Sequence, residues 1–172
     1  MIVEAHEPRS GGRLFRHYVA HRSENGKPRP SAVAGLFRCS AAANFMNRRV
    51  ISTPDAPSAI GPYSQAIHTG NLLFVSGQIP IDPATGNLID DKTIQAQTRR
   101  VLQNLLAIVG AAGGSAENVV RTTVFLQDMG QFAEMNAVYS EFFTANPPAR
   151  STVEAARLPR DVPVEIDCIA VI

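Results

Sequence analysis

The last nine residues of the chain, 164–172, alternate between side chains of opposite character. A period of two is typical of a β-strand with one buried and one partly exposed face. Val164, Ile166 and Cys168 would then point to one side, and Glu165 and Asp167 to the other. This segment predicts a sheet with one covered face and a second face that carries two carboxylates.

Two helices are expected upstream of this strand. Apolar positions recur at helical spacing over residues 94–112, with Asp91 as the candidate N-cap and Gly113-Gly114 as the terminator. A second amphipathic helix is expected over residues 132–143, with Asp128 as its cap. Both helices need a sheet to cover their apolar sides.

Four segments have strand character. The short apolar run 72–75 is flanked by turn residues and indicates a buried strand, and 119–127 is rich in Val and Thr. Two further strands are expected over 151–157 and 164–172, separated by a turn. Strands interleaved with two helices indicate an α+β or α/β layer, with both helices on one face of a mixed sheet. No third helix is evident, so a partner subunit is the simplest cover for the other face, which predicts a closed symmetric oligomer.

The chain length of 172 residues and the hydrophobic content of 45% favour one domain, expected over residues 46–172. Residues 1–45 lack periodicity and are expected to be disordered. Two interpretations of this extension stay open. It is either an Arg-rich targeting peptide for a mitochondrion or plastid, or an over-long start, with Met46 as the initiator of a cytoplasmic protein.

Charge and motifs argue against several classes of protein. Residues 1–45 carry seven Lys or Arg against three Glu, whereas the remainder carries nine against twelve acidic residues, so nucleic acid is an unfavoured partner. Cys39 and Cys168 show neither metal-site nor disulfide-framework spacing, His68 is the only histidine after the extension, and no apolar run reaches the length of a membrane span. We therefore expect no metal and no membrane partner.

Arg150 and Glu165 are the strongest candidates for chemistry. An isolated arginine is usually a solvated surface charge, but Arg150 follows the stiff segment Asn146-Pro-Pro-Ala149 at the start of a predicted strand. A guanidinium offers paired donors that match the two oxygens of a carboxylate. Glu165 on its strand would be a plain exposed charge unless a cleft surrounds it.

Six short motifs occur together in one order, and they resemble those of the RidA family, also called YjgF, from about residue 50 to the end. They are Ala59-Ile-Gly-Pro-Tyr-Ser-Gln-Ala66, Val75-Ser-Gly-Gln-Ile-Pro80, Thr122-Thr-Val-Phe125, Met135-Asn136, Pro148-Ala-Arg-Ser151 with Val153-Glu154, and Val164-Glu-Ile-Asp167. Any single motif is weak, whereas six in register are specific.

The resemblance implies a chorismate-mutase-like α+β homotrimer with clefts between subunits. It also implies hydrolytic deamination, without cofactor, of reactive 2-imino and enamino acids such as 2-aminoacrylate and 2-iminobutyrate to 2-keto acids and ammonia, which protects pyridoxal-phosphate enzymes. Arg150 would hold the substrate carboxylate, and Glu165 would orient or deprotonate the attacking water. The remaining residues that the resemblance assigns to substrate binding are Tyr63, Ser76, Gly77, Asn136 and Thr152.

One departure from the family pattern concerns Thr152, because many relatives have cysteine there. The family mechanism uses the backbone carbonyl at this position, so activity is expected to survive the difference. Two other functions are weighed beside the deaminase: a non-catalytic trimer that binds a small ligand, and an RNA-cleaving or translation-inhibiting protein. The presence of Arg150 and Glu165 argues against the first, and the acidic body argues against the second.

Overall fold

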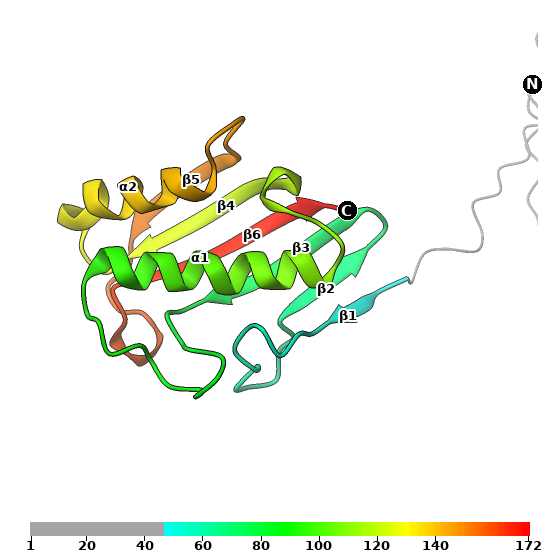
Figure 1. Cartoon of the computed structure of the whole chain (residues 1–172), viewed down its shortest axis with the longest axis horizontal. Coiled ribbons are helices and arrows are strands. Elements are labelled where there is room, and N and C mark those ends of the chain that lie inside the picture. Colours follow the sequence, from blue (N-terminus) through cyan, green and yellow to red (C-terminus); the bar gives the residue numbers. More distant parts are fainter. Residues whose placement is uncertain (1–46) are drawn as a thin grey trace, which may run out of the picture. The chain divides into compact units, whose positions relative to one another are not determined.

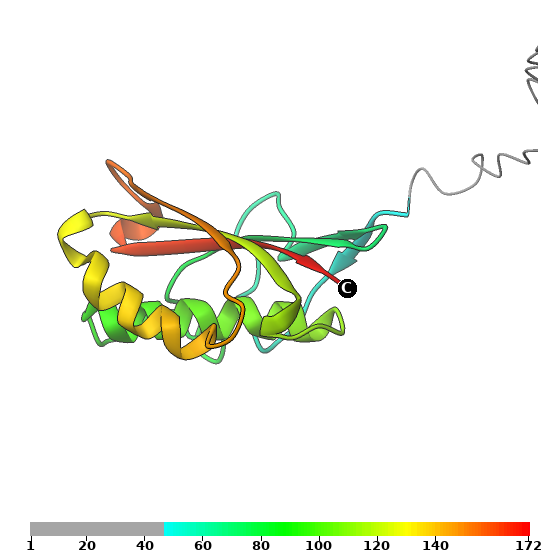
Figure 2. The same cartoon turned by 90° about the horizontal axis from the view of Figure 1, so that it is seen from above.

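The computed structural model describes residues 47–172. The expected disorder of residues 1–45, the targeting peptide and the start at Met46 lie outside the described residues. Within 47–172, a single six-stranded sheet has the strand order β1-β2-β3-β6-β4-β5. Two helices cover one face of this sheet (Figures 1 and 2).

The elements alternate along the chain much as the sequence predicts. The helices are α1, Ile94–Ala111, and α2, Phe132–Phe142, and three short 3-10 turns connect other elements. The strands are β1 (Arg49–Ile51), β2 (Ala66–Thr69), β3 (Leu72–Gln78), β4 (Val119–Leu126), β5 (Ala149–Glu154) and β6 (Val164–Val171). β4 and β5 pair in parallel and every other neighbouring pair is antiparallel, which confirms the mixed sheet.

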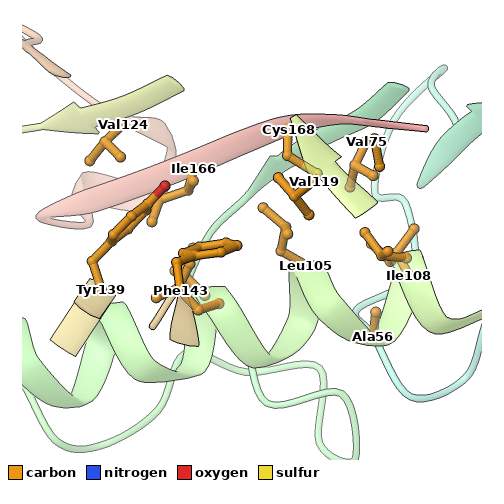
Figure 3. Packing of buried hydrophobic residues seen from close by; sticks show 14 of the residues in the cluster. Ala56, Val75, Leu105, Ile108, Val119, Val124, Tyr139, Phe143, Ile166 and Cys168 are labelled. Carbon is orange, nitrogen blue, oxygen red and sulfur yellow. The ribbon is translucent and has the colours of Figure 1, made fainter. Parts of the chain in front are cut away.

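The core lies between α1, α2 and the covered face of β3, β4 and β6 (Figure 3). The helix α1 presents one apolar stripe, in which Val101, Leu105 and Ile108 are fully buried. The alternation predicted for the last strand is confirmed, because the side chains of Val164, Ile166, Cys168 and Ala170 are buried, whereas Glu165 and Asp167 are only half-buried. Burial of these aliphatic side chains is the main stabilising contribution of the fold.

The caps of the two helices differ from the sequence prediction. The N-cap of α1 is Thr93, whose hydroxyl accepts a hydrogen bond from the backbone N–H of Ala96, and Asp91 instead accepts from the backbone and hydroxyl of Thr93. Asp128 caps a 3-10 turn over Met129–Gln131, and α2 then continues from Phe132. In both cases the acidic residue accepts hydrogen bonds in the segment just before the helix and is not the N-cap of the helix itself.

The C-terminal end of α1 is confirmed. Gly113 has a φ of +97°, and the backbone N–H of Gly114 donates to the carbonyl of Val109. This reversal in a left-handed conformation is a common helix terminus, and glycine adopts it without the steric cost of a Cβ atom.

Two strand predictions need correction, and two strands were missed. The apolar run 72–75 belongs to the longer β3, and it is buried on one face only, because Phe74 is 41% exposed. The strand β5 covers 149–154 and not 151–157, since pairing with β4 begins directly after the proline pair. The strands β1 and β2 were not predicted, because both are short and β2 has no strict alternation.

The face of the sheet opposite the helices is open in the described protomer. Its apolar side chains include two pairs of register partners, Phe74 with Ile169 and Phe125 with Val153, and also Val171, which lies opposite Leu72. No helix among the described residues has the length and apolarity needed to cross a bilayer.

Candidate active site

Arg150 lies near the start of β5, where the chain leaves Pro147 and Pro148. It is the register partner of the buried Thr122 on β4, so its side chain lies on the helix-covered side of the sheet. There its Nη2 atom donates a hydrogen bond of 2.8 Å to Oδ1 of Asn136 on α2. The proline pair therefore delivers the guanidinium to a fixed place beside α2.

Two aromatic rings of α2 flank the same guanidinium. Its Cζ atom lies 4.5 Å from the ring centroid of Tyr139 and 5.6 Å from that of Phe132. Both distances are within the range of a cation–π interaction. Among the described residues, Asn136 is the only hydrogen-bond partner of the Arg150 side chain, so most of its five N–H donors stay available for a ligand.

Asn136 was predicted as a site residue, whereas Tyr139 was predicted only as one position of the amphipathic helix over residues 132–143. The signal that could have found it is the spacing on α2, where Phe132, Asn136 and Tyr139 follow each other at four and three residues. Residues at this spacing share one side of a helix. An arginine that meets that side is then in contact with all three.

Thr152 lies two residues after Arg150 on the same side of β5, opposite Val124. Its side chain is half-buried. β5 is an edge strand, so one edge of its backbone is not paired within the described sheet. Arg150, Asn136 and Thr152 form one group, which we call the arginine group.

Glu165 lies on the open face of the sheet, opposite Phe125 of β4. The carboxylate rests against the backbone of Gly77, where a Cβ atom added to the glycine would overlap Oε1 of Glu165. Gly77 lies at an irregularity in the pairing of β3 with β6, between Val75 and Gln78. Glycine therefore permits a close approach that any other residue would block.

Tyr63 and Ser76 lie at the same end of β3. The Ser76 hydroxyl donates to the carbonyl of Ser64 at 2.7 Å, and its backbone N–H donates to the carbonyl of Gln65. Tyr63 is 49% exposed and lines a small pocket together with Gly77. We call Tyr63, Ser76, Gly77 and Glu165 the glutamate group.

The pocket beside Tyr63 measures about 30 Å³. That volume accommodates only a water molecule or two. This pocket therefore has no room for an amino-acid-sized ligand, and Glu165 is not among its lining residues. Apolar side chains, among them Ile60, Ile79 and Ile81, line part of the pocket wall.

The two groups lie on opposite faces of the sheet. Arg150 shares the side of Thr122, which contacts α2, whereas Glu165 shares the side of Phe125. The described protomer therefore brings together the members of each group and does not bring Arg150 and Glu165 into one cleft.

The environment changes the acidity of two side chains on β6. Burial raises the pKa of Glu165, and the negative charge of Asp167 raises it further. Burial, assisted by Asp167, also raises the pKa of Cys168 to about 12. This thiol is protonated at neutral pH and packed in the core, so it is not a nucleophile. Among residues 47–172, no three His, Cys, Asp or Glu side chains gather into a metal site.

An α+β protein with two helices on one face of a mixed sheet, and with an arginine held by α2 on an edge strand, is the class that this fold and geometry define. Residues 53–172 match the family described as Endoribonuclease L-PSP. The chain belongs to this family, which is also the family of the YjgF and RidA proteins.

Three relatives illustrate the similarity. A RutC family protein of Pyrococcus horikoshii is 54% identical, over 72% of this chain and 97% of its own length. The 2-iminobutanoate/2-iminopropanoate deaminase of Salmonella typhimurium is 51% identical, with the same coverage of 72% and 97%. The structure of E. coli TdcF with bound serine is 47% identical, covers 72% of this chain and 98% of its own, and superposes with a TM-score of 0.69.

Proposed function

We propose that this protein hydrolyses small 2-imino acids to 2-keto acids and ammonia. The observation that carries the proposal is the Arg150 guanidinium, which is held by Asn136 and two aromatic rings while most of its donors stay free. Such a group binds a carboxylate through paired hydrogen bonds. The name of the Salmonella typhimurium relative and the serine bound to TdcF support a small substrate with an amino-acid skeleton.

We further propose that the working site forms between the subunits of a homotrimer. The arginine group and the glutamate group lie on opposite faces of one protomer, so a rotationally symmetric ring would place the first group of one copy against the second group of its neighbour. The apolar side chains of the open face would be covered in the same assembly. A closed ring of three then contains three equivalent sites.

Within such a site, Arg150 would fix the substrate carboxylate and thereby place the imine carbon. Glu165 would accept a proton from water as the water oxygen bonds to that carbon and the C=N π electrons move to nitrogen. Glu165 would return this proton to the nitrogen of the resulting tetrahedral adduct. As the hydroxyl proton of the adduct also passes to the nitrogen, the C–N bond breaks, the C=O bond of the keto acid forms, and ammonia leaves. The backbone carbonyl of Thr152 would accept a hydrogen bond from the substrate nitrogen, and Tyr63 and Ser76 would line the same space.

No covalent intermediate with the protein is needed, because an imine carbon is already electrophilic. Positioning of the carboxylate, an ordered water and exclusion of bulk solvent are sufficient physical contributions. These substrates also hydrolyse spontaneously, so the proposed acceleration is modest by the standard of enzymes.

The proposed role of Glu165 predicts a pH dependence. The carboxylate form accepts the proton, so kcat/KM should fall as the pH drops through the raised pKa of Glu165. In Asp167→Asn, the neighbouring negative charge is lost and the pKa of Glu165 falls, so this acid limb should move to lower pH. The substituted amide still offers an oxygen to the backbone N–H of Thr123. An unmoved acid limb in Asp167→Asn, after subtraction of spontaneous hydrolysis, would contradict the assignment.

The proposed reaction is tested with the purified full chain and 2-iminobutyrate that threonine dehydratase generates in the cuvette. We expect 2-oxobutyrate to appear faster than in the same mixture without the protein. A single-stranded RNA incubated with the protein in parallel should stay intact. RNA cleavage without accelerated keto-acid release would favour the nuclease alternative. If the protein shows neither activity, a non-catalytic protein that binds a carboxylate is the remaining interpretation.

A further inference from the structure

A buried pair of hydroxyl groups lies directly beneath the arginine group. The hydroxyl of Tyr139 on α2 is 2.7 Å from the hydroxyl of Thr122 on β4. The side chain of Thr122 is fully buried and Tyr139 is only 5% exposed. Figure 3 shows the ring of Tyr139 extending from the helix layer toward the sheet, with its oxygen at the sheet end.

Packing alone gives no reason for these hydroxyls. The neighbouring covered positions on β4 are Val124 and Leu126, so an apolar residue would suit position 122 equally well. Phenylalanine would fill the space of the Tyr139 ring. Burial raises the pKa of Tyr139, so its hydroxyl stays protonated and able to donate. What the pair adds is a tether that fixes the ring relative to β4.

The tethered ring is the one nearest to Arg150. Thr122 and Arg150 are register partners on adjacent strands, and the face of the Tyr139 ring is 4.5 Å from the Arg150 Cζ atom. The hydrogen bond to Asn136 constrains one edge of the guanidinium, and a ring face constrains its plane. Together they leave the remaining donors aimed in a defined direction.

We propose that Tyr139, tethered by Thr122, is a positioning residue that holds the Arg150 guanidinium in the orientation needed to bind a carboxylate. The inference rests on the proposed function, because it assigns the carboxylate as the ligand of Arg150. Tyr139 itself does not touch the substrate. It affects the reaction indirectly, because it fixes the plane and the position of the Arg150 guanidinium.

The chain offers a matched control in Phe143. Its ring packs against that of Tyr139 at 4.7 Å between centroids, and it is equally buried at 6% exposure. Its ring is not among those that contact Arg150. Tyr139→Leu and Phe143→Leu therefore remove similar aromatic packing from the same cluster, and only the first removes the surface beneath the guanidinium.

Kinetics on 2-iminobutyrate separate a positioning role from a structural one. The carboxylate does not change during the reaction, so its binding contributes chiefly to KM. We expect Tyr139→Leu to raise KM about tenfold, as a lost cation–π contact predicts, and Phe143→Leu to leave KM within about twofold with a similar loss of thermal stability. In an Arg150→Ala background, Tyr139→Leu should have no further effect on kcat/KM. An equal rise of KM in Phe143→Leu, or a full effect of Tyr139→Leu without Arg150, would overturn the proposal.

Nitrogen-15 NMR of the ligand-free full chain tests the inference independently of turnover. We expect an Nε–H signal of Arg150, identified by its absence in Arg150→Lys, that is present in wild type and Phe143→Leu and lost in Tyr139→Leu. Persistence of the signal in Tyr139→Leu would overturn the positioning role. Loss of the signal in a protein that does not accelerate imine hydrolysis would instead overturn the proposed function alone.

A second variant covers the case in which Tyr139→Leu does not fold. Tyr139→Phe keeps the ring and the core volume but removes the tether to Thr122. We expect its KM to rise about threefold, in line with the loss of one hydrogen bond, and its Arg150 Nε–H signal to broaden. An unchanged KM and signal in Tyr139→Phe would overturn the role of the tether.

Discussion

Arg150→Ala is expected to lower kcat/KM for 2-iminobutyrate by at least about thirtyfold, because removal of one partner of a desolvated charge pair costs about 2–5 kcal/mol. The loss should appear without unfolding. Arg150 lies on an edge strand and is half-buried, and its substitution removes one hydrogen bond, to Asn136. Thermal melting of the variant beside wild type checks this point.

Two controls make the result specific. Arg100→Ala removes a positive charge from α1, a helix that carries none of the proposed site residues, and should leave kcat/KM unchanged. Arg150→Lys keeps the charge but loses the paired donors, so it should recover only a small part of the activity. Full activity in Arg150→Lys would mean that charge alone suffices, and full activity in Arg150→Ala would refute the carboxylate clamp.

The architecture was predictable from the sequence where periodicity is long. The helix α1 and the strand β6 each bury one side, and their apolar residues recur at helical or strand spacing over many positions. The strands β1 and β2 are too short to show a period, and pairing organises them, since β2 pairs with β3 and β1 pairs with β2. The caps of the helices differed because Asp91 accepts hydrogen bonds from Thr93, which itself caps α1, and because a 3-10 turn capped by Asp128 precedes α2.

The sequence predicts the members of a candidate site but not their arrangement. The motifs select Arg150 and Glu165 as candidates, yet the face on which each side chain lies depends on strand register, which short-range pattern does not specify. The residues of α2 that contact Arg150 share one side of the helix, and they meet Arg150 because α2 packs on the face of the sheet to which the Arg150 side chain points. The role proposed for Tyr139 depends on this packing, because a tyrosine in an amphipathic helix looks like any other core residue.

Mixing two inactive variants is expected to restore activity, because the arginine group and the glutamate group lie on opposite faces of one subunit. Arg150→Ala lacks the arginine group and Glu165→Gln lacks the proton acceptor. If each site joins the arginine group of one subunit to the glutamate group of the next, every mixed trimer contains one intact site. Random exchange at equal amounts should then restore about a quarter of wild-type activity.

The measurement unfolds the two variants together, refolds the mixture, and follows 2-iminobutyrate hydrolysis beside each variant refolded alone. Sedimentation of the refolded protein establishes that trimers are present. A site contained within one subunit would give no recovery, since each subunit then carries a defective site whatever its neighbour. Activity near a quarter distinguishes the shared site from that arrangement, because recovery requires Arg150 and Glu165 to come from different copies of the chain.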